Sequence, residues 1–257
     1  AGAGLLMMQD LGDDLVARVL EREPGMAEPI YARITDLLVD LHRHRPPAVM
    51  ALDGPELARQ VGMFADWYPE AVGSDPTPAQ AIAGIVENLH TELCADLPPV
   101  LSLRDFHAEN LIWRGEAPLG LLDFQDAVAC HPAYDLVSVL HDARRDIPAE
   151  AEASAIARFL ADTGLEADRF HAAFALLGAQ RNLRILGIFA RLCLRDGKPP
   201  DFSRGFSSRP QLRGSTELAG SSHNDGWGAH CYTPGKPAAP DASFRDWTCA
   251  EGLSCQA

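Results

Sequence analysis

LRDFHAEN at residues 103–110 is followed, after a short apolar segment, by LLDFQD at residues 121–126. Within this pattern Asp105 and Asn110 lie five positions apart, and Asp123 lies thirteen positions beyond Asn110. Apolar residues flank both motifs, so a strand–loop–strand frame would bring the three side chains to one end of a small sheet. Phosphoryl transfer from a nucleotide needs such a set, because one carboxylate orients the attacking hydroxyl and hard oxygen atoms hold the metal ion. The spacing therefore indicates the catalytic half of a kinase-like phosphotransferase.

Each of these side chains has an expected role. We expect Asp105 to be the catalytic residue, which orients the acceptor hydroxyl and can accept its proton. Asn110 and Asp123 are expected to bind magnesium. An isolated Asp or Asn is more often a turn or cap residue, but the joint pattern favours the catalytic interpretation. Two further residues are expected to order the loop by hydrogen bonding, namely His107 inside the first motif and Asp135 on the first turn of an expected helix.

Four other residues are candidates for binding the acceptor substrate. Gln125 and Asp126 lie just past Asp123 in the second motif, and a pair that only caps the loop is an equal alternative. Arg181 interrupts an apolar helical segment, where a buried ion pair is the more ordinary explanation. Trp67 would offer a flat face to a sugar ring, and packing at a helix end is the alternative.

The composition excludes some classes of protein. The chain has 257 residues, of which 47% are apolar, which suits one or two domains with a buried core. The formal charge of −14 argues against a nucleic-acid or anionic-membrane binder. No apolar run reaches the ~18 residues of a membrane span. The six cysteines show no CxxC spacing, so we expect free thiols, a reducing compartment and a cytoplasmic location.

The chain changes character near Gly197. All of the net negative charge lies in residues 1–197, and the first lysine is Lys198. The remainder is rich in Gly, Pro and Ser and lacks helical periodicity. We therefore expect a hinge-like segment at 1–10, a kinase-like C-terminal lobe at 11–197, and an irregular tail at 198–257 that is disordered or translated out of frame.

Apolar residues that recur every three or four positions predict a mostly helical chain. The expected helices are 15–22, 27–45, 56–68, 78–95, 133–142, 147–163 and 168–195. Short strands are expected at 100–103, 111–114 and 119–122, and a further buried strand at 4–10. This order predicts an α+β fold class: a protein-kinase-like C-terminal lobe, mostly helical, with one small catalytic β-hairpin.

Residues 4–195 resemble the aminoglycoside phosphotransferase/choline kinase-like family. The superfamily resemblance is carried by LRDFHAENL at 103–111 and GLLDFQDA at 120–127. Within the family, the chain is most similar to the bacterial amino-sugar kinases that phosphorylate N-acetylmuramate and N-acetylglucosamine at the anomeric hydroxyl during cell-wall recycling. That narrower resemblance is carried by HPAYDLVS at 131–138, DARRD at 142–146 and QRNLRILGIF at 180–189.

The resemblance implies ATP as co-substrate, Mg²⁺ as cofactor, Asp105 as catalytic base, and Asn110 and Asp123 as the magnesium ligands. It also implies a nucleotide hinge that contacts the adenine, formed by Met7, Met8, Gln9 and Asp10. Family members have an N-terminal lobe with a phosphate-covering loop and a lysine. No lysine and no GxGxxG precedes the hinge-like segment here, so we expect this lobe to be absent and the chain to be an incomplete form with little activity alone.

Two alternatives to an ATP-dependent amino-sugar kinase stay open. One is an aminoglycoside- or choline-type small-molecule kinase, since an acidic pocket suits cationic acceptors. The other is a non-catalytic pseudokinase fragment that acts as a binding module. The expected partners are ATP and an amino-sugar acceptor, with no nucleic acid and no membrane. The sequence leaves the acceptor, the anomeric specificity and the oligomeric state open.

Overall fold

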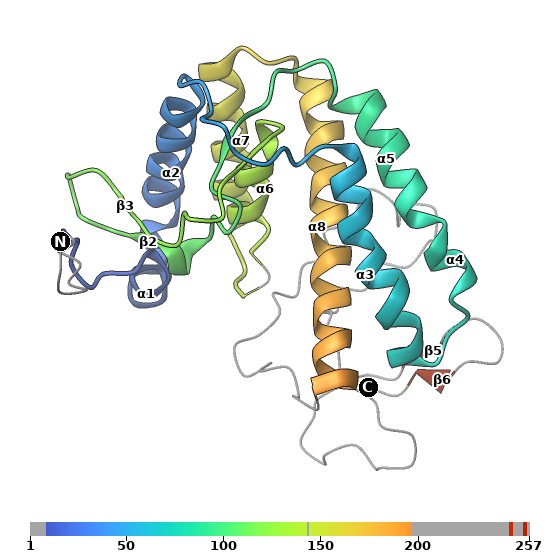
Figure 1. The fold of residues 1–257 in the computed structure, drawn as a ribbon. Coiled ribbons are helices and arrows are strands. Elements are labelled where there is room, and N and C mark those ends of the chain that lie inside the picture. Colours follow the sequence, from blue (N-terminus) through green and yellow to red (C-terminus); the bar gives the residue numbers. More distant parts are fainter. Residues whose placement is uncertain (1–8, 143, 197–246, 249–253, 256–257) are drawn as a thin grey trace, which may run out of the picture. The chain divides into compact units, whose positions relative to one another are not determined.

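The computed structural model describes residues 9–142, 144–196, 247–248 and 254–255. The chain divides into two compact units (Figure 1). Unit 1 comprises Ala1–Asp53 and Leu93–Gly178, and unit 2 comprises Gly54–Glu92 and Ala179–Ala257. The long helix α8 (Ala167–Asp196) begins in unit 1 and ends in unit 2.

Unit 1 is built around a pair of helices. α2 (Ala27–His42) packs against α7 (Ala149–Thr163), and the apolar stripe of α2 that faces inward (Ile30, Ile34 and Leu38) is fully buried. Each such side chain contributes about 1.5–3 kcal/mol through burial. The helices of this unit are α1 (Val16–Arg22), the 3₁₀ turn η1 (Pro24–Met26), α2 (Ala27–His42), α6 (Ala133–Leu140), α7 (Ala149–Thr163) and the first part of α8.

Local sequence sets the limits of α7. Acidic residues Glu150 and Glu152 occupy its first turn, where the helix dipole favours negative charge. Gly164 ends it with φ +68°, a left-handed conformation that glycine adopts without steric cost. The N–H of Gly164 donates to the carbonyl of Leu160 at 2.9 Å and satisfies one carbonyl of the last turn.

Unit 1 also contains two small antiparallel sheets. β1 (Val100–Ser102) pairs with β4 (Val128–Cys130), with Leu101 opposite Ala129. β2 (Leu111–Ile112) pairs with β3 (Gly120–Leu121), with Leu111 opposite Leu121. Single bridges extend both sheets, because Ala51 pairs with Ala129 and Leu15 pairs with Ile112. A one-turn 3₁₀ helix, η2 (Ala108–Asn110), leads directly into β2.

An arginine holds the turn of the β2–β3 hairpin. Arg33 of α2 donates to the carbonyls of Gly115 at 3.1 Å and Ala117 at 2.8 Å. Its guanidinium also lies 5.5 Å from the centroid of the Trp113 ring, a favourable cation–π distance. The hairpin is thus fixed at its turn as well as at the end where η2 enters.

Unit 2 holds α3 (Gly54–Val72), α4 (Thr77–Gln80), α5 (Ile82–Leu93) and the rest of α8. The backbones of α3 and α8 approach closely at Gly187, where an added Cβ would lie 2.5 Å from the carbonyl carbon of Met63. Next to this crossing, the buried amide of Gln180 donates to the carbonyl of Leu57 at 3.2 Å. Glycine at 187 is therefore required by packing.

The expected α+β class is confirmed, since the described residues are mostly helical with a few short strands. Most expected helices are present, with corrected limits. The helix expected at 27–45 ends at His42, and α3 continues through Pro69 to Val72 because a proline only removes one N–H near the end of the helix. The segment expected as one helix at 78–95 forms α4 and α5, and β4 was not predicted because three residues show no clear alternation.

Several expectations concern parts of the chain that the structure does not describe. Residues 4–8 of the strand expected at 4–10 lie outside the described residues, and Gln9 and Asp10 are not in a strand. Most of the tail at 198–257 also lies outside them, although β5 (Trp247–Thr248) pairs with β6 (Ser254–Cys255). Cys94 and Cys130 are free and buried, and burial raises the pKa of the Cys94 thiol to about 12. Cys193 is disulfide-bonded, so the expectation of free thiols was wrong there, because sequence spacing does not reveal which thiols meet in space. None of the described helices has the length and apolar character to cross a bilayer.

Candidate active site

The loop that carries Asp105 is held by one buried carboxylate. Asp135 on α6 is 1% exposed, and it accepts the backbone N–H of Leu103 at 2.7 Å and that of Arg104 at 3.1 Å. It also accepts the hydroxyl of Ser102 at 2.6 Å. Arg104 has φ +67°, a left-handed conformation that costs a non-glycine residue about 1–2 kcal/mol. These hydrogen bonds stabilise that conformation one residue before Asp105.

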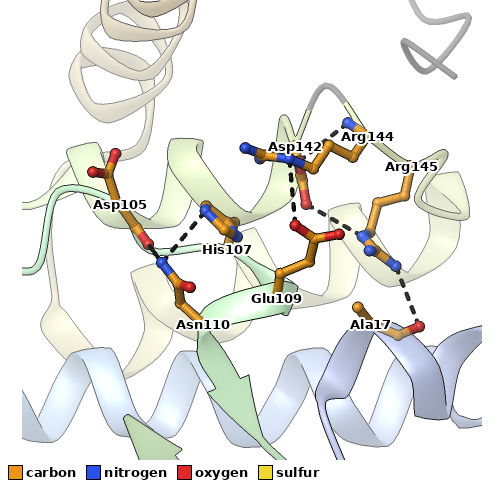
Figure 2. A network of polar contacts seen from close by, with 8 residues as sticks. All are labelled: Ala17, Asp105, His107, Glu109, Asn110, Asp142, Arg144 and Arg145. Carbon is orange, nitrogen blue, oxygen red and sulfur yellow. Dashed lines mark hydrogen bonds and ion pairs between the residues drawn. The ribbon is translucent and has the colours of Figure 1, made fainter. Parts of the chain in front are cut away.

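The side chain of Asn110 is hydrogen-bonded to the backbone of Asp105. The side-chain amide nitrogen of Asn110 donates to the backbone carbonyl of Asp105 at 2.9 Å and lies 3.4 Å from Nε2 of His107. Figure 2 shows the carboxylate of Asp105 directed away from this amide. Among the described residues, no donor meets the Asp105 carboxylate or the amide oxygen of Asn110. Both groups therefore keep oxygen atoms available for a ligand.

Asp123 lies at the same end of the hairpin as Asn110. The N–H of Leu122 donates to the carbonyl of Asn110 at 2.9 Å, so the hairpin register sets Asn110 one residue from Asp123. Asp123 is exposed and has φ +56°, the second non-glycine residue with positive φ in the described part of the chain. One of its carboxylate oxygens accepts the amide of Gln125 at 2.5 Å. Strained residues of this kind gather at functional sites.

The donor set fits a hard divalent cation. Asn110 supplies an amide oxygen and Asp123 a carboxylate oxygen, which are ligands that Mg²⁺ accepts together with water and phosphate oxygens. The described residues contain no group of three or more His, Cys, Asp or Glu side chains that could hold a metal by themselves. The site therefore suits an ion that arrives with a phosphate ligand better than a permanently bound structural metal.

The remaining residues of the two motifs differ in exposure. His107 is 8% exposed, beneath the loop with Phe106, which is 2% exposed. Gln125 and Asp126 are exposed beside Asp123. Phe124, which follows Asp123 as Phe106 follows Asp105, is 57% exposed, because the left-handed turn at Asp123 redirects the chain.

The hinge and the acceptor candidates are only partly described. Met7 and Met8 lie outside the described residues, whereas Gln9 and Asp10 are exposed and Asp10 accepts the N–H of Gly12 at 2.9 Å. The other two candidates belong to unit 2, whereas Asp105 belongs to unit 1. Trp67 is half-buried on α3, and Arg181 is 7% exposed on α8.

Sequence reasoning missed a network of charged residues beside the loop (Figure 2). Glu109 of η2 lies 3.6 Å from Arg144, and Arg144 lies 3.2 Å from Asp142. The other oxygen of Asp142 accepts Nε of Arg145 at 3.2 Å, and Arg145 also donates to the carbonyl of Ala17 at 3.5 Å. The DARRD segment was noted only for its resemblance, and its alternating charges were the available signal.

Ser102 and Ser138 are two further residues that the sequence did not single out. The hydroxyl of Ser138 donates to the carbonyl of Arg104 at 3.3 Å, while Ser102 binds Asp135 and accepts the N–H of Arg104 at 3.1 Å. The backbone N–H and the backbone carbonyl of the strained residue Arg104 are thus both satisfied by buried side chains. Small hydroxyl residues carry no sequence signal for such a role.

Comparison with known proteins identifies similar chains. Residues 2–174 match the family described as "Phosphotransferase enzyme family". A protein of Caulobacter vibrioides named N-acetylmuramate/N-acetylglucosamine kinase is 41% identical over 214 residues, which are 77% of this chain and 58% of that protein. A protein of Pseudomonas aeruginosa with the same name is 30% identical over 238 residues, which are 85% of this chain and 70% of that protein.

Among solved structures, choline kinase LicA from Streptococcus pneumoniae is similar with a TM-score of 0.47 and 13% identity, over 63% of this chain and 56% of that one. The match to the Caulobacter relative and another to a Pseudomonas putida relative cover 58% and 60% of those proteins. The chain thus spans less than two thirds of their length.

Proposed function

This chain belongs to the phosphotransferase enzyme family, and from that premise we propose that it transfers the γ-phosphoryl group of ATP to the anomeric hydroxyl of an amino sugar, N-acetylmuramate or N-acetylglucosamine. One observation carries the proposal. The hairpin register and the bond from the Asn110 amide to the Asp105 carbonyl bring Asp105, Asn110 and Asp123 to one end of a hairpin. Their open oxygen atoms suit this reaction.

Asp105 is proposed as the catalytic residue. Its carboxylate accepts a hydrogen bond from the sugar hydroxyl, orients that oxygen toward the γ-phosphorus, and takes the proton as the new O–P bond forms and the bond to the β-phosphate oxygen breaks. The transition state is loose, so the position of the hydroxyl matters more than the basicity of the carboxylate. The half-exposed side chain and its lack of a donor among the described residues support this role.

Asn110 and Asp123 would hold Mg²⁺. The ion would supply positive charge that offsets the negative charge developing on the leaving phosphate. Asn110 is oriented for this by its own amide nitrogen, which is committed to the Asp105 carbonyl and leaves the oxygen free. Asp135 and His107 are proposed as loop-ordering residues, acting on the backbone that precedes Asp105 and on the Asn110 amide.

The other assignments are extensions of the same proposal. The nucleotide hinge comprises Met7, Met8, Gln9 and Asp10. The candidates for contacting the acceptor are Gln125, Asp126, Arg181 and Trp67. We further propose a cytoplasmic enzyme of cell-wall recycling that acts on peptidoglycan-derived sugars, with residues 11–197 forming the catalytic lobe.

The test is a panel of acceptors with the product of the complete gene, because the chain spans about 58% of its Caulobacter relative. N-acetylmuramate, N-acetylglucosamine, kanamycin and choline are each incubated with Mg-ATP, and the products are identified by ³¹P NMR. We expect a sugar 1-phosphate, and we expect Asp105→Asn to lower kcat by about 10²-fold or more. Glu116→Gln, in the exposed hairpin turn, is the matched control and should retain activity.

Other outcomes decide between the alternatives. Transfer to kanamycin or choline alone would replace the amino-sugar assignment with an antibiotic- or choline-type kinase. Absence of transfer to every acceptor, with Asp105→Asn indistinguishable from the wild type, would favour a non-catalytic binding module.

A further inference from the structure

Four charged side chains connect the catalytic loop to α1. They alternate in sign along the order Glu109, Arg144, Asp142 and Arg145, and the last of them donates to the carbonyl of Ala17 in α1. All belong to unit 1. We call this set the ion-pair network. It has no part in the chemistry proposed above, and Figure 2 shows it beside Asn110.

The centre of the ion-pair network is Asp142. Its side chain is 1% exposed, and a buried carboxylate must be compensated by close donors. It accepts the N–H of Arg144 at 3.1 Å, a guanidinium nitrogen of Arg144 at 3.2 Å and Nε of Arg145 at 3.2 Å. Asp142 therefore holds the guanidinium of Arg144 on one side, although the Arg144 side chain is 45% exposed.

The free side of Arg144 meets the catalytic loop. Its Nε lies 3.6 Å from the Glu109 carboxylate, and Glu109 is the middle residue of the three-residue helix η2 that ends at Asn110. A single 3₁₀ turn has few backbone hydrogen bonds of its own, so an outside contact can set its position. An isolated exposed ion pair would do little, but this arginine is already ordered by a buried partner.

We propose that Arg144 is a positioning residue which, through Glu109, holds η2 and thereby Asn110 in place for cation binding. The inference rests on the proposed function in one respect, that Asn110 is a metal ligand. Residues that orient a ligand from outside the metal's own contacts affect metal affinity roughly 10–100-fold when they are replaced.

The test measures binding as well as turnover, in the product of the complete gene. Mg²⁺ is titrated calorimetrically in the presence of a non-hydrolysable ATP analogue, and kcat and KM are measured against Mg²⁺. Arg144→Gln should weaken Mg²⁺ binding about tenfold and raise the KM for Mg²⁺, with a smaller change in kcat at saturating Mg²⁺. Arg144→Lys should recover part of the affinity, because it keeps the charge but not the forked geometry.

The matched control is Arg158→Gln. Arg158 is 46% exposed and, like Arg144, meets two carboxylates, Asp36 and Asp162, but it lies on α7 away from η2. It should leave Mg²⁺ affinity unchanged. Glu109→Gln should weaken binding as Arg144→Gln does, and the double variant should be no worse than either single one. The Glu109→Gln variant also tests the proposal if Arg144→Gln does not fold.

The outcomes separate the two proposals. Wild-type Mg²⁺ affinity in Arg144→Gln and Glu109→Gln, or an equal loss in Arg158→Gln, would overturn the positioning role whatever the acceptor is. Normal Mg²⁺ binding without transfer to any acceptor would overturn the proposed function and leave the binding comparison valid. A wild-type protein that binds the nucleotide without any dependence on Mg²⁺ would overturn both.

Discussion

The buried carboxylate of Asp135 holds the backbone N–H of Arg104, a residue with φ +67°, at 3.1 Å. Leu103 and Ser102 donate to the same carboxylate, so Asp135→Ala removes the acceptor of three donors, of which the Arg104 N–H keeps a second acceptor in the Ser102 hydroxyl. We expect it to lower the free energy of unfolding by about 3 kcal/mol or more. Denaturant titration of the variant measures this loss.

Ser138→Ala provides the comparison for Asp135→Ala. It removes the hydrogen bond to the carbonyl of Arg104 and should cost about 1 kcal/mol. Equal losses in the two variants would show that the Asp135 carboxylate has no special role in holding the loop.

Asp123 is expected to be essential for metal-dependent nucleotide binding. Asp123→Asn preserves the shape of the side chain, and asparagine tolerates φ +56°, so the free energy of unfolding should change little. Loss of one anionic oxygen should abolish most of the Mg²⁺-dependent binding of ATP. Calorimetric titration with Mg-ATP measures it, and a wild-type isotherm would refute the assignment of Asp123 as a metal ligand.

The crossing of α3 and α8 predicts a strong effect of one methyl group. In Gly187→Ala the new Cβ would lie 2.5 Å from the carbonyl carbon and 2.7 Å from the carbonyl oxygen of Met63, and backbone atoms cannot move aside easily. The free energy of unfolding should fall by about 1–3 kcal/mol. Gly62→Ala, in the same α3 helix with nothing within 4 Å of its Cβ, should be neutral or stabilising by about 0.5–1 kcal/mol.

His42 predicts a pH dependence of stability. Burial, with a smaller effect of nearby His131, lowers the pKa of His42 from 6.5 to about 4, and its ring packs edge-on against Phe159. Between these values the unfolded chain binds a proton that the folded chain does not, so stability falls as the pH drops from about 6.5 to about 4. The full effect is roughly 3 kcal/mol.

The pH prediction is checked with His42→Gln. Its free energy of unfolding should fall less than that of the wild type over the same pH range, because the titrating group is gone. His44→Gln, at an exposed position two residues away, is the control. Parallel pH curves for His42→Gln and the wild type would contradict the prediction.

The helices were largely predictable because their apolar periodicity is long. α2 and α7 present regular buried stripes, and the glycine at 164 marks the end of α7. The short strands were harder to predict, since β4 has three residues and the bridge at Ala51 depends on a partner far along the chain. Pairing of that kind has no local signature.

The candidate site shows the same contrast between local signals and contacts that are distant in sequence. Asp105, Asn110 and Asp123 were singled out because they lie within two short motifs whose spacing suits phosphoryl transfer, and their roles stay predictions. The contact between Glu109 and Arg144 and that between Ser138 and Arg104 join residues that are distant in sequence. Only the fold brings such partners together, so no reading of the sequence alone could have assigned them.

The orientation of the Asn110 side chain has a chemical consequence. Its nitrogen is 2.9 Å from the carbonyl oxygen of Asp105, and a carboxylate at this position would set two oxygen atoms against each other. Aspartate, although the stronger ligand for a cation in isolation, is therefore the poorer residue at 110. We predict that deamidation of Asn110, which replaces this donor with a carboxylate oxygen, would weaken the cation binding proposed for this residue.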